Sequence, residues 1–395
     1  MEDKKIGIGI IGLGGRGVHF GGELFSKFPD CKIVGLHDVS QYKVDEARKV
    51  LGDIPGTTSI DEFLTIPGMD AVIICSSPAA HAQNCIDVLA ARKHVYVEKP
   101  MATTIEDCDA MIDAWTGTNV VFMVGLELRY CTLMQDMKKI IESGEIGEIK
   151  IGTVIDNVSV GGRYYYHDRH RRRKETMKTI LLEKGTHSLD LANWLVDSSP
   201  RKVYYSGAMD VYGGNEPNDK RCRDCEKKVD CPFYLDYKGF RHASIVQKDD
   251  LCVFAQECDV HDNSLVIIDY DNGARICYME CHFTPEYSRE FMFVGDKGKI
   301  YGFYNNEQEF KITVWKRHTR KIEMYIPERR SGGHGGGDEG IAREFIERVK
   351  LGKPALPGIL GARDSAAIAI AAAESAETGM PVLIPKKKMP IECER

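Results

Sequence analysis

The first third of the chain alternates short apolar runs with segments of helical periodicity. The apolar runs predict strands at residues 6–11, 32–37, 71–75, 94–97 and 120–124. The segments between them predict helices at residues 16–28, 43–51, 81–91 and 105–115. Apolar strands separated by helices are typical of βαβ units on a parallel sheet. Residues 1–128 are therefore predicted to form one α/β domain.

After Arg129 the pattern changes to longer stretches rich in β-branched and aromatic residues. These stretches predict strands at residues 149–160, 203–209, 265–270, 274–283, 290–294, 299–304 and 312–318. Helices are predicted at residues 133–143, 180–195, 338–350 and 363–378. The Asn272-Gly273 pair predicts a tight hairpin turn. Residues 129–395 are thus predicted to form an α+β domain with a mostly antiparallel, open sheet.

The composition narrows the class of protein. The 395 residues carry a formal net charge of −6, and general nucleic-acid binding requires instead a surplus of Lys and Arg. The sequence has no run of 18 apolar residues and no secretory pattern at its start. We expect a cytoplasmic protein that acts on a small molecule and binds neither nucleic acid nor membrane.

A glycine-rich turn follows the first predicted strand and opens the first predicted helix. In this context the GxGxxG pattern indicates a Rossmann domain, whose glycines bring backbone close to the pyrophosphate of a dinucleotide. Asp38 ends the second predicted strand, where a carboxylate would bind the adenosine ribose hydroxyls and repel a 2′-phosphate. NAD is therefore preferred over NADP, with Arg16 as the one residue that argues the other way. The predicted cofactor contacts of this region are Gly12, Gly14, Gly15, Arg16, Gly17 and Asp38.

Three further motifs carry a resemblance to a known family. Glu98-Lys99-Pro100, CSSPAAH at residues 75–81 and EKGTHSLD at residues 183–190, together with the glycine turn, resemble the Gfo/Idh/MocA oxidoreductases, the family of glucose-fructose oxidoreductase and inositol dehydrogenase. The resemblance covers nearly the whole chain. It implies an active site between the two domains and a homo-oligomer, from dimer to hexamer, whose contacts often involve the open sheet. It also implies cofactor contacts at Ser76, Ser77, Pro78, His81, Glu98 and Lys99.

The resemblance places two catalytic candidates at this site, Lys99 and His187. A lysine beside a cationic nicotinamide ring has its ammonium form disfavoured, so Lys99 could take the proton of a substrate hydroxyl. Glu183 and Asp190 share a helical face with His187, and either could orient its imidazole. Lys184 departs from the common family pattern, which leaves open whether Lys99, His187 or Lys184 is the principal acid or base. Glu183 and Lys184 are also candidate substrate contacts.

Other candidates lie outside these motifs. Arg163 belongs to a segment of tyrosines and cations, residues 161–174, that could bind an anionic sugar or form a solvated or oligomeric face. Arg129 lies at the domain junction and His334 lies in a glycine loop, and both are candidate substrate contacts. The spacing of Cys222, Cys225 and Cys231 suits metal ligation, and Cys252 could complete a structural zinc site; free buried thiols are the alternative.

These predictions point to an NAD-dependent oxidoreductase that moves a hydride between NAD and ring carbon C3 of a sugar, glycoside or cyclitol. An alternative is a redox-neutral glycoside hydrolase, in which transient oxidation at that carbon enables elimination of the aglycone. A third hypothesis is a sensor that binds NAD without chemistry, and the joint presence of Lys99 and His187 argues against it.

Overall fold

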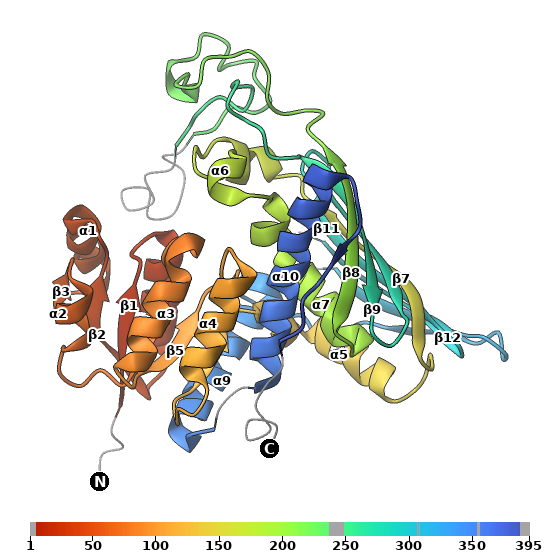
Figure 1. Ribbon diagram of the computed structural model, residues 1–395, viewed down its shortest axis with the longest axis horizontal. Coiled ribbons are helices and arrows are strands. Elements are labelled where there is room, and N and C mark those ends of the chain that lie inside the picture. Colours follow the sequence, from red (N-terminus) through yellow and green to blue (C-terminus); the bar gives the residue numbers. More distant parts are fainter. Residues whose placement is uncertain (1–4, 237–248, 306, 308, 354–355, 388–395) are drawn as a thin grey trace.

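Two sheets, one parallel and one mostly antiparallel, organise the chain in a computed structural model that describes residues 5–236, 249–305, 307, 309–353 and 356–387 (Figure 1). The first sheet has six parallel strands in the order β3-β2-β1-β4-β5-β6. The strands are β1 (Ile6–Ile11), β2 (Cys31–His37), β3 (Gly56–Thr57), β4 (Ala71–Ile74), β5 (His94–Val97) and β6 (Phe122–Val124). This order, with its switch beside β1, confirms the predicted Rossmann architecture.

Helices connect these strands as the periodicity predicts. They are η1 (Gly17–Leu24), η2 (Phe25–Lys27), α1 (Gln41–Leu51), α2 (Ile60–Leu64), η3 (Pro78–Ala80), α3 (His81–Ala90) and α4 (Ile105–Trp115). The first predicted helix is a wide π-helical turn, η1, followed by a 3-10 turn, η2. The short elements β3 and α2 were not predicted, because two and five residues are too few to show a period.

The second sheet has nine strands in the order β14-β13-β12-β11-β7-β10-β9-β8-β15. The strands are β7 (Ile149–Asn157), β8 (Pro200–Ala208), β9 (Asn263–Tyr270), β10 (Arg275–Cys281), β11 (Ser288–Gly295), β12 (Gly298–Asn305), β13 (Phe310–Lys316), β14 (Ile322–Tyr325) and β15 (Val382–Leu383). All neighbours are antiparallel except β7 and β10. The predicted hairpin is confirmed: Gly273 has φ +82° and joins β9 to β10.

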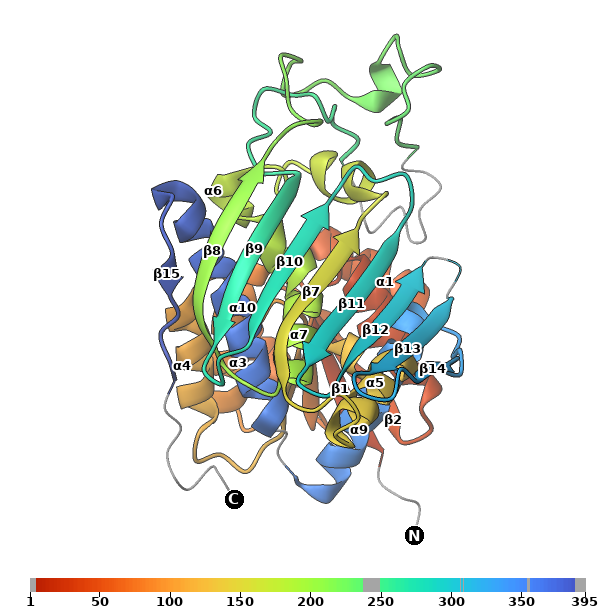
Figure 2. The ribbon, with the colours of Figure 1, turned by 90° about the vertical axis from the view of Figure 1, so that its right-hand side faces the viewer.

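Helices cover one face of this second sheet and leave the other face open (Figure 2). The helices that follow β6 along the chain are η4 (Glu127–Tyr130), α5 (Thr132–Glu142), η5 (Gly162–Tyr166), α6 (Lys174–Met177), η6 (Leu181–Gly185), α7 (Thr186–Val196), η7 (Cys222–Asp224), η9 (Gly333–Gly336), α9 (Gly337–Leu351) and α10 (Leu356–Thr378). Helix α10 packs against β8 and α7. Within the described residues no helix has both the length and the apolar character needed to cross a membrane.

Helix α9 returns to the first domain. Its apolar face joins a core cluster with the helix η1 and the strand β5, in which Phe345 packs edge-on against Phe25 at 6.2 Å and against Tyr96 at 5.8 Å. Phe20 lies beside both partners, 5.6 Å from Phe25 and 5.1 Å from Tyr96. The chain therefore crosses the predicted domain division at residue 129 a second time, and α9 completes the core of the parallel sheet.

Candidate active site

A cavity of about 570 Å³ lies between the two domains, beyond the carboxyl ends of the parallel strands β4 and β5. This is the edge of a doubly wound sheet where ligands bind. The cavity brings Lys99, from the end of β5, together with His187, from α7. The predicted site residues that line it are Arg16, Ser76, Pro78, His81, Glu98, Lys99, Glu183, Lys184, His187 and His334.

The glycine turn has the shape that a dinucleotide requires. Gly12 has φ +86°, and a Cβ there would lie 2.4 Å from the backbone nitrogen of Ser76. A Cβ on Gly17 would lie 1.9 Å from the carbonyl oxygen of Gly12, so only glycine lets the helix approach the turn. A Cβ on Gly14 would meet nothing within 4 Å, which leaves room for phosphate against the backbone. Gly15 begins the helical backbone directly after it. These residues fit the pyrophosphate of NAD.

Asp38 is buried beside this turn. Its carboxylate accepts hydrogen bonds from the backbone nitrogens of Leu13, at 2.8 Å, and Ser40, at 3.0 Å. Asp38 thereby ties the end of β2 to the glycine turn. Lys43 lies 3.9 Å from the same carboxylate.

Arg16 points away from this end of the site and into a cluster of carboxylates. Its guanidinium pairs with Glu98 at 2.6 Å and with Asp338 at 3.1 Å, and it also donates to Glu127. Burial opposes the charge of Arg16, but these carboxylates raise its pKa well above the ordinary value. In this arrangement the donors of Arg16 are taken up by carboxylates and are not directed at Asp38, so the predicted preference for NAD over NADP keeps its basis in Asp38.

Lys99 is fixed by the second domain. Its ammonium donates a 2.7 Å hydrogen bond to the carbonyl oxygen of Glu183, in η6. Burial lowers the pKa of Lys99, and the nearby carboxylates of Glu183 and Glu98 only partly offset this. A lysine in this environment can exchange a proton near neutral pH more readily than a surface lysine.

His187 is only 4% exposed, and both of its ring nitrogens lack a hydrogen-bond partner within the described residues. The Oε2 atom of Glu127 lies 3.8 Å from its Nε2 atom and is itself unpaired among these residues. Burial lowers the pKa of His187 far below its ordinary value, and the neighbouring imidazole of His334 and the ammonium of Lys99 lower it further. The imidazole is therefore neutral and open to a partner that enters the cavity.

The predicted orienting residues of His187 are engaged elsewhere. Glu183 forms an ion pair with Arg171 at 2.8 Å. Asp190 accepts two hydrogen bonds from Arg129, at 2.6 and 2.7 Å. The prediction that Glu183 or Asp190 orients the ring is thus wrong. The wide π-helical turn η6 holds Glu183, so the i, i+4 spacing no longer brings this residue beneath His187.

A second imidazole faces His187 from the glycine loop. The rings of His334 and His187 are 5.0 Å apart, and the Nδ1 atom of His334 donates to Asp338 at 2.8 Å. His334 has φ +52°, and Gly335 and Gly336 also have positive φ, so the loop turns sharply to present this ring. Burial raises the pKa of Asp338, but His334 and Arg16 more than reverse this, so the carboxylate is ionised and fixes the ring.

Glu127, His187 and His334 place ligand atoms within 4.8 Å of one another, close enough to share an ion. The surroundings oppose a metal, because Lys99 and Arg289 act on His187 as positive charges. A hydroxyl group satisfies the same unpaired nitrogens and oxygen without adding charge, since it both donates and accepts. The geometry therefore suits the recognition of a polyhydroxylated molecule.

Lys184 contacts a tyrosine on the opposite wall. Its ammonium donates to the hydroxyl oxygen of Tyr287 at 3.1 Å, and Arg289 donates to the same oxygen at 3.1 Å. Burial opposes ionisation of Tyr287, but Arg289 and Lys184 lower the pKa of its hydroxyl to about 8. Sequence reasoning missed both Tyr287 and Arg289. A signal existed for Arg289, since it shares the inward face of β11 with two phenylalanines.

One predicted substrate contact, Arg129, does not line this cavity. Arg129 forms its ion pair with Asp190 and lines a separate cavity near η4, so its role as a substrate contact is corrected to a buried link between η4 and α7. The side chain of Arg163 lies outside the described residues. Ser77 is exposed at the start of η3 and does not line the cavity. The lining residues that were not predicted are Cys75, Val158, Val160, Tyr164, Tyr165, Arg171, Tyr287, Arg289 and Tyr304.

The predicted metal ligands gather around a different, much smaller cavity of about 20 Å³. Cys222, Cys225, Cys231 and Cys252 all line it as free thiols. In the part of the chain that the structure describes, these sulfurs are not among the groups of ligand atoms that lie within 4.8 Å of one another.

Comparison with known proteins matches both domains. A family model described as "Oxidoreductase family, NAD-binding Rossmann fold" (GFO_IDH_MocA) matches residues 6–126, and one described as "Oxidoreductase family, C-terminal alpha/beta domain" matches residues 138–384. The scyllo-inositol 2-dehydrogenase (NAD(+)) of Bacillus subtilis is 23% identical over 394 residues, which cover 98% of each chain. The myo-inositol 2-dehydrogenase of Thermotoga maritima is 26% identical over 212 residues, covering 51% of this chain and 58% of that enzyme. A levoglucosan dehydrogenase structure with NADH and levoglucosan superposes with a TM-score of 0.74 at 20% identity, covering 97% of this chain and all of the other.

Proposed function

Because the chain belongs to the GFO_IDH_MocA family of oxidoreductases, we propose that it oxidises a hydroxyl-bearing carbon of a sugar or cyclitol and uses NAD as the hydride acceptor. The observation that carries this proposal is the convergence of Lys99 and His187 on one cavity beside the glycine turn. NAD, when bound, supplies the acceptor for the hydride. The residues of the chain supply the proton chemistry and the orientation of the substrate.

Lys99 takes the hydroxyl proton in this proposal. Its ammonium is held at a fixed position by the carbonyl oxygen of Glu183, and burial lowers its pKa. His187 is neutral, and it either accepts a hydrogen bond from the same hydroxyl or donates one to it. Fixing the hydroxyl between an amine and an imidazole aligns the carbon–hydrogen bond for transfer. Lys184 acts on the substrate rather than as the principal base, since its ammonium is paired with Tyr287.

The walls of the cavity support a polyhydroxylated ring as the substrate class. Tyr164, Tyr165, Tyr287 and Tyr304 contribute aromatic faces and hydroxyl groups. Aromatic faces suit the apolar sides of sugar rings, and buried polar groups reject analogues that lack the matching hydroxyl. The inositol and levoglucosan dehydrogenases among the similar proteins support the same class. We propose ring carbon C3 as the position oxidised.

Incubation of the protein with NAD and a panel of sugars, cyclitols and glycosides tests the proposal. Net formation of NADH with one member of the panel is the expected result. Release of an aglycone without net NADH would instead identify a redox-neutral glycoside hydrolase. Binding of NAD with no change in any member of the panel would contradict an enzymatic role and favour a sensor.

The open face of the second sheet supports a homo-oligomer. On β9, Leu265 is 49% exposed and Ile267 is 50% exposed, while their neighbours Val266 and Ile268 are buried on the other face. A strand that is apolar on both faces is typical of a sheet covered on both sides. We propose that copies of the chain associate through this face, which Figure 2 shows uncovered. A monomeric mass in solution would contradict this.

A further inference from the structure

The four cysteines lie in an irregular excursion between two neighbouring strands. β8 ends at Ala208 and β9 begins at Asn263, and these two residues are paired in the sheet. Residues 209–262 connect them, and the described part of this stretch, residues 209–236 and 249–262, extends beyond the ends of these strands (Figure 1). The described part of this excursion contains one short helix, η7, and isolated bridges at Glu216–Ala255 and Arg221–Leu251. So little regular hydrogen bonding leaves the excursion dependent on its side chains for a fixed shape.

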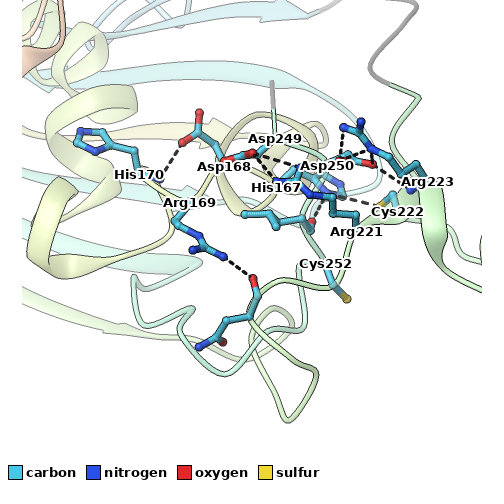
Figure 3. Close-up of polar contacts among 12 residues, drawn as sticks. His167, Asp168, Arg169, His170, Arg221, Cys222, Arg223, Asp249, Asp250 and Cys252 are labelled. Carbon is cyan, nitrogen blue, oxygen red and sulfur yellow. Dashed lines mark hydrogen bonds and ion pairs between the residues drawn. The ribbon is translucent and has the colours of Figure 1, made fainter. Parts of the chain in front are cut away.

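The cysteines bring distant parts of this excursion together. Cys222, Cys225 and Cys231 come from its first half, and Cys252 comes from its second half. All four line the cavity of about 20 Å³. Cys222 is buried, and its sulfur lies 3.8 Å from the Nδ1 atom of His167. Figure 3 shows His167, Cys222 and Cys252 on neighbouring loops. Four free thiols around a space this small are more than a packed apolar core needs.

Donor groups and positive side chains lie around the sulfurs. The backbone amide of Leu235 donates to Cys222, and the amide of Phe254 donates to Cys252. Amide donors at a sulfur stabilise a thiolate. The positive side chains of Arg221 and Lys228 border the same cavity.

We propose that Cys222, Cys225, Cys231 and Cys252 bind one zinc ion as four thiolates. The C-x2-C spacing of the first pair lets both sulfurs reach one ion, and a four-sulfur, tetrahedral set is typical of structural zinc. Zinc–sulfur bonds of about 2.3 Å require the sulfurs to contract around the ion. The sulfurs must move closer together when they bind the ion, because among the described residues no three of them lie within 4.8 Å of one another, although all four line one cavity of about 20 Å³. Each thiol releases its proton when its sulfur binds the ion.

The zinc site has a consequence for the active cavity. Arg172 is fully buried and donates to the carbonyl oxygen of Cys252 at 3.1 Å and to that of Asn218 at 2.8 Å. Its neighbour Arg171 lines the active cavity. The excursion also packs against Tyr165 and Tyr166 in one apolar cluster. Zinc therefore stabilises the excursion and, through it, one wall of the substrate cavity.

Metal analysis of the purified full chain, kept reduced, tests the site. We expect about one zinc per chain, as in other four-thiolate sites. Cys225→Ser and Cys231→Ser change half-buried ligands, and each is expected to lose zinc and to lower the unfolding temperature. Cys277→Ser is the matched control, because Cys277 is another half-buried free thiol, on β10 and away from this cavity. The control is expected to keep its zinc.

A second measurement needs no variant. Metal-stripped protein titrated with Co²⁺ should develop thiolate-to-cobalt absorption that Zn²⁺ then removes. Absence of zinc in the purified chain together with absence of this absorption would overturn the proposal, as would zinc retained by both Cys225→Ser and Cys231→Ser. A disulfide among the four cysteines in the purified protein, found by mass spectrometry, would also overturn it. None of these readouts depends on catalytic activity.

Discussion

Replacement of Lys99 by methionine isolates the proton chemistry of the proposed reaction. The variant keeps the length of the side chain and removes the ammonium that donates to the carbonyl oxygen of Glu183 at 2.7 Å. Loss of one such hydrogen bond lowers the free energy of unfolding by only about 1 kcal/mol. A positioned acid or base contributes about 10²- to 10⁴-fold in rate, or roughly 3–5 kcal/mol in the activation barrier. We therefore expect a folded protein whose kcat falls by at least about a hundredfold.

NADH formation under single-turnover conditions measures this loss, and titration of NADH fluorescence measures cofactor binding. The glycine turn is untouched in the variant, so the Kd for NADH should stay within about threefold of the wild-type value. Lys93→Met is the matched control: the ammonium of Lys93 also donates to a backbone carbonyl oxygen, that of Met69 at 2.8 Å, at the far end of the parallel strands. Wild-type kcat should fall as the pH falls, because a protonated Lys99 cannot accept the hydroxyl proton, and the variant should lose this dependence. A Lys99→Met enzyme with near wild-type kcat would refute the reasoning.

Three further outcomes follow from buried charges. Asp38→Ala should raise the KM for NAD and lower the ratio of kcat/KM with NAD to kcat/KM with NADP. Steady-state kinetics with both dinucleotides measures this ratio, and an unchanged ratio would contradict the prediction. Arg129→Leu should lower the free energy of unfolding by about 3–5 kcal/mol, because Asp190 stays buried and unpaired, and denaturant titration should show partial recovery in the Arg129→Leu/Asp190→Leu double variant. Burial lowers the pKa of His81 and His187 in the folded chain, so below about pH 6.5 the unfolded chain binds more protons than the folded chain. The free energy of unfolding should therefore fall as the pH falls, by at most about 1.4 kcal/mol per pH unit for each histidine. An unfolding temperature that stays the same from about pH 7 to 5 would contradict this.

Local patterns predicted the fold because each of its main devices is local. Strand β1, for example, is a continuous apolar run, and two adjacent residues, Asn272 and Gly273, indicate the hairpin turn between β9 and β10. The glycine turn, residues 12–17, is likewise contiguous. These features need no knowledge of distant contacts, so the parallel and antiparallel sheets were both confirmed.

The active site was predicted less completely because much of it depends on contacts between distant residues. Arg16 and Asp338 are 322 residues apart, and nothing local in either segment indicates their pairing. Glu127 lies in a short turn, η4, without a motif of its own. The error over Glu183 had a different origin, since a regular α-helix was assumed where the chain forms a wider turn. Lys99 and His187 were identified because the family resemblance marks them.

The return of α9 to the parallel sheet limits how this chain can be divided. A fragment that stopped at residue 128 would contain the complete cofactor fingerprint, yet it would leave Phe25 and Tyr96 without the partner that Phe345 provides. Such a fragment would present aromatic side chains to water and would tend to self-associate. A shortened protein for binding studies must therefore rejoin residues 337–351 to the amino-terminal part, and any deletion that removes them alters the dinucleotide domain from a distance.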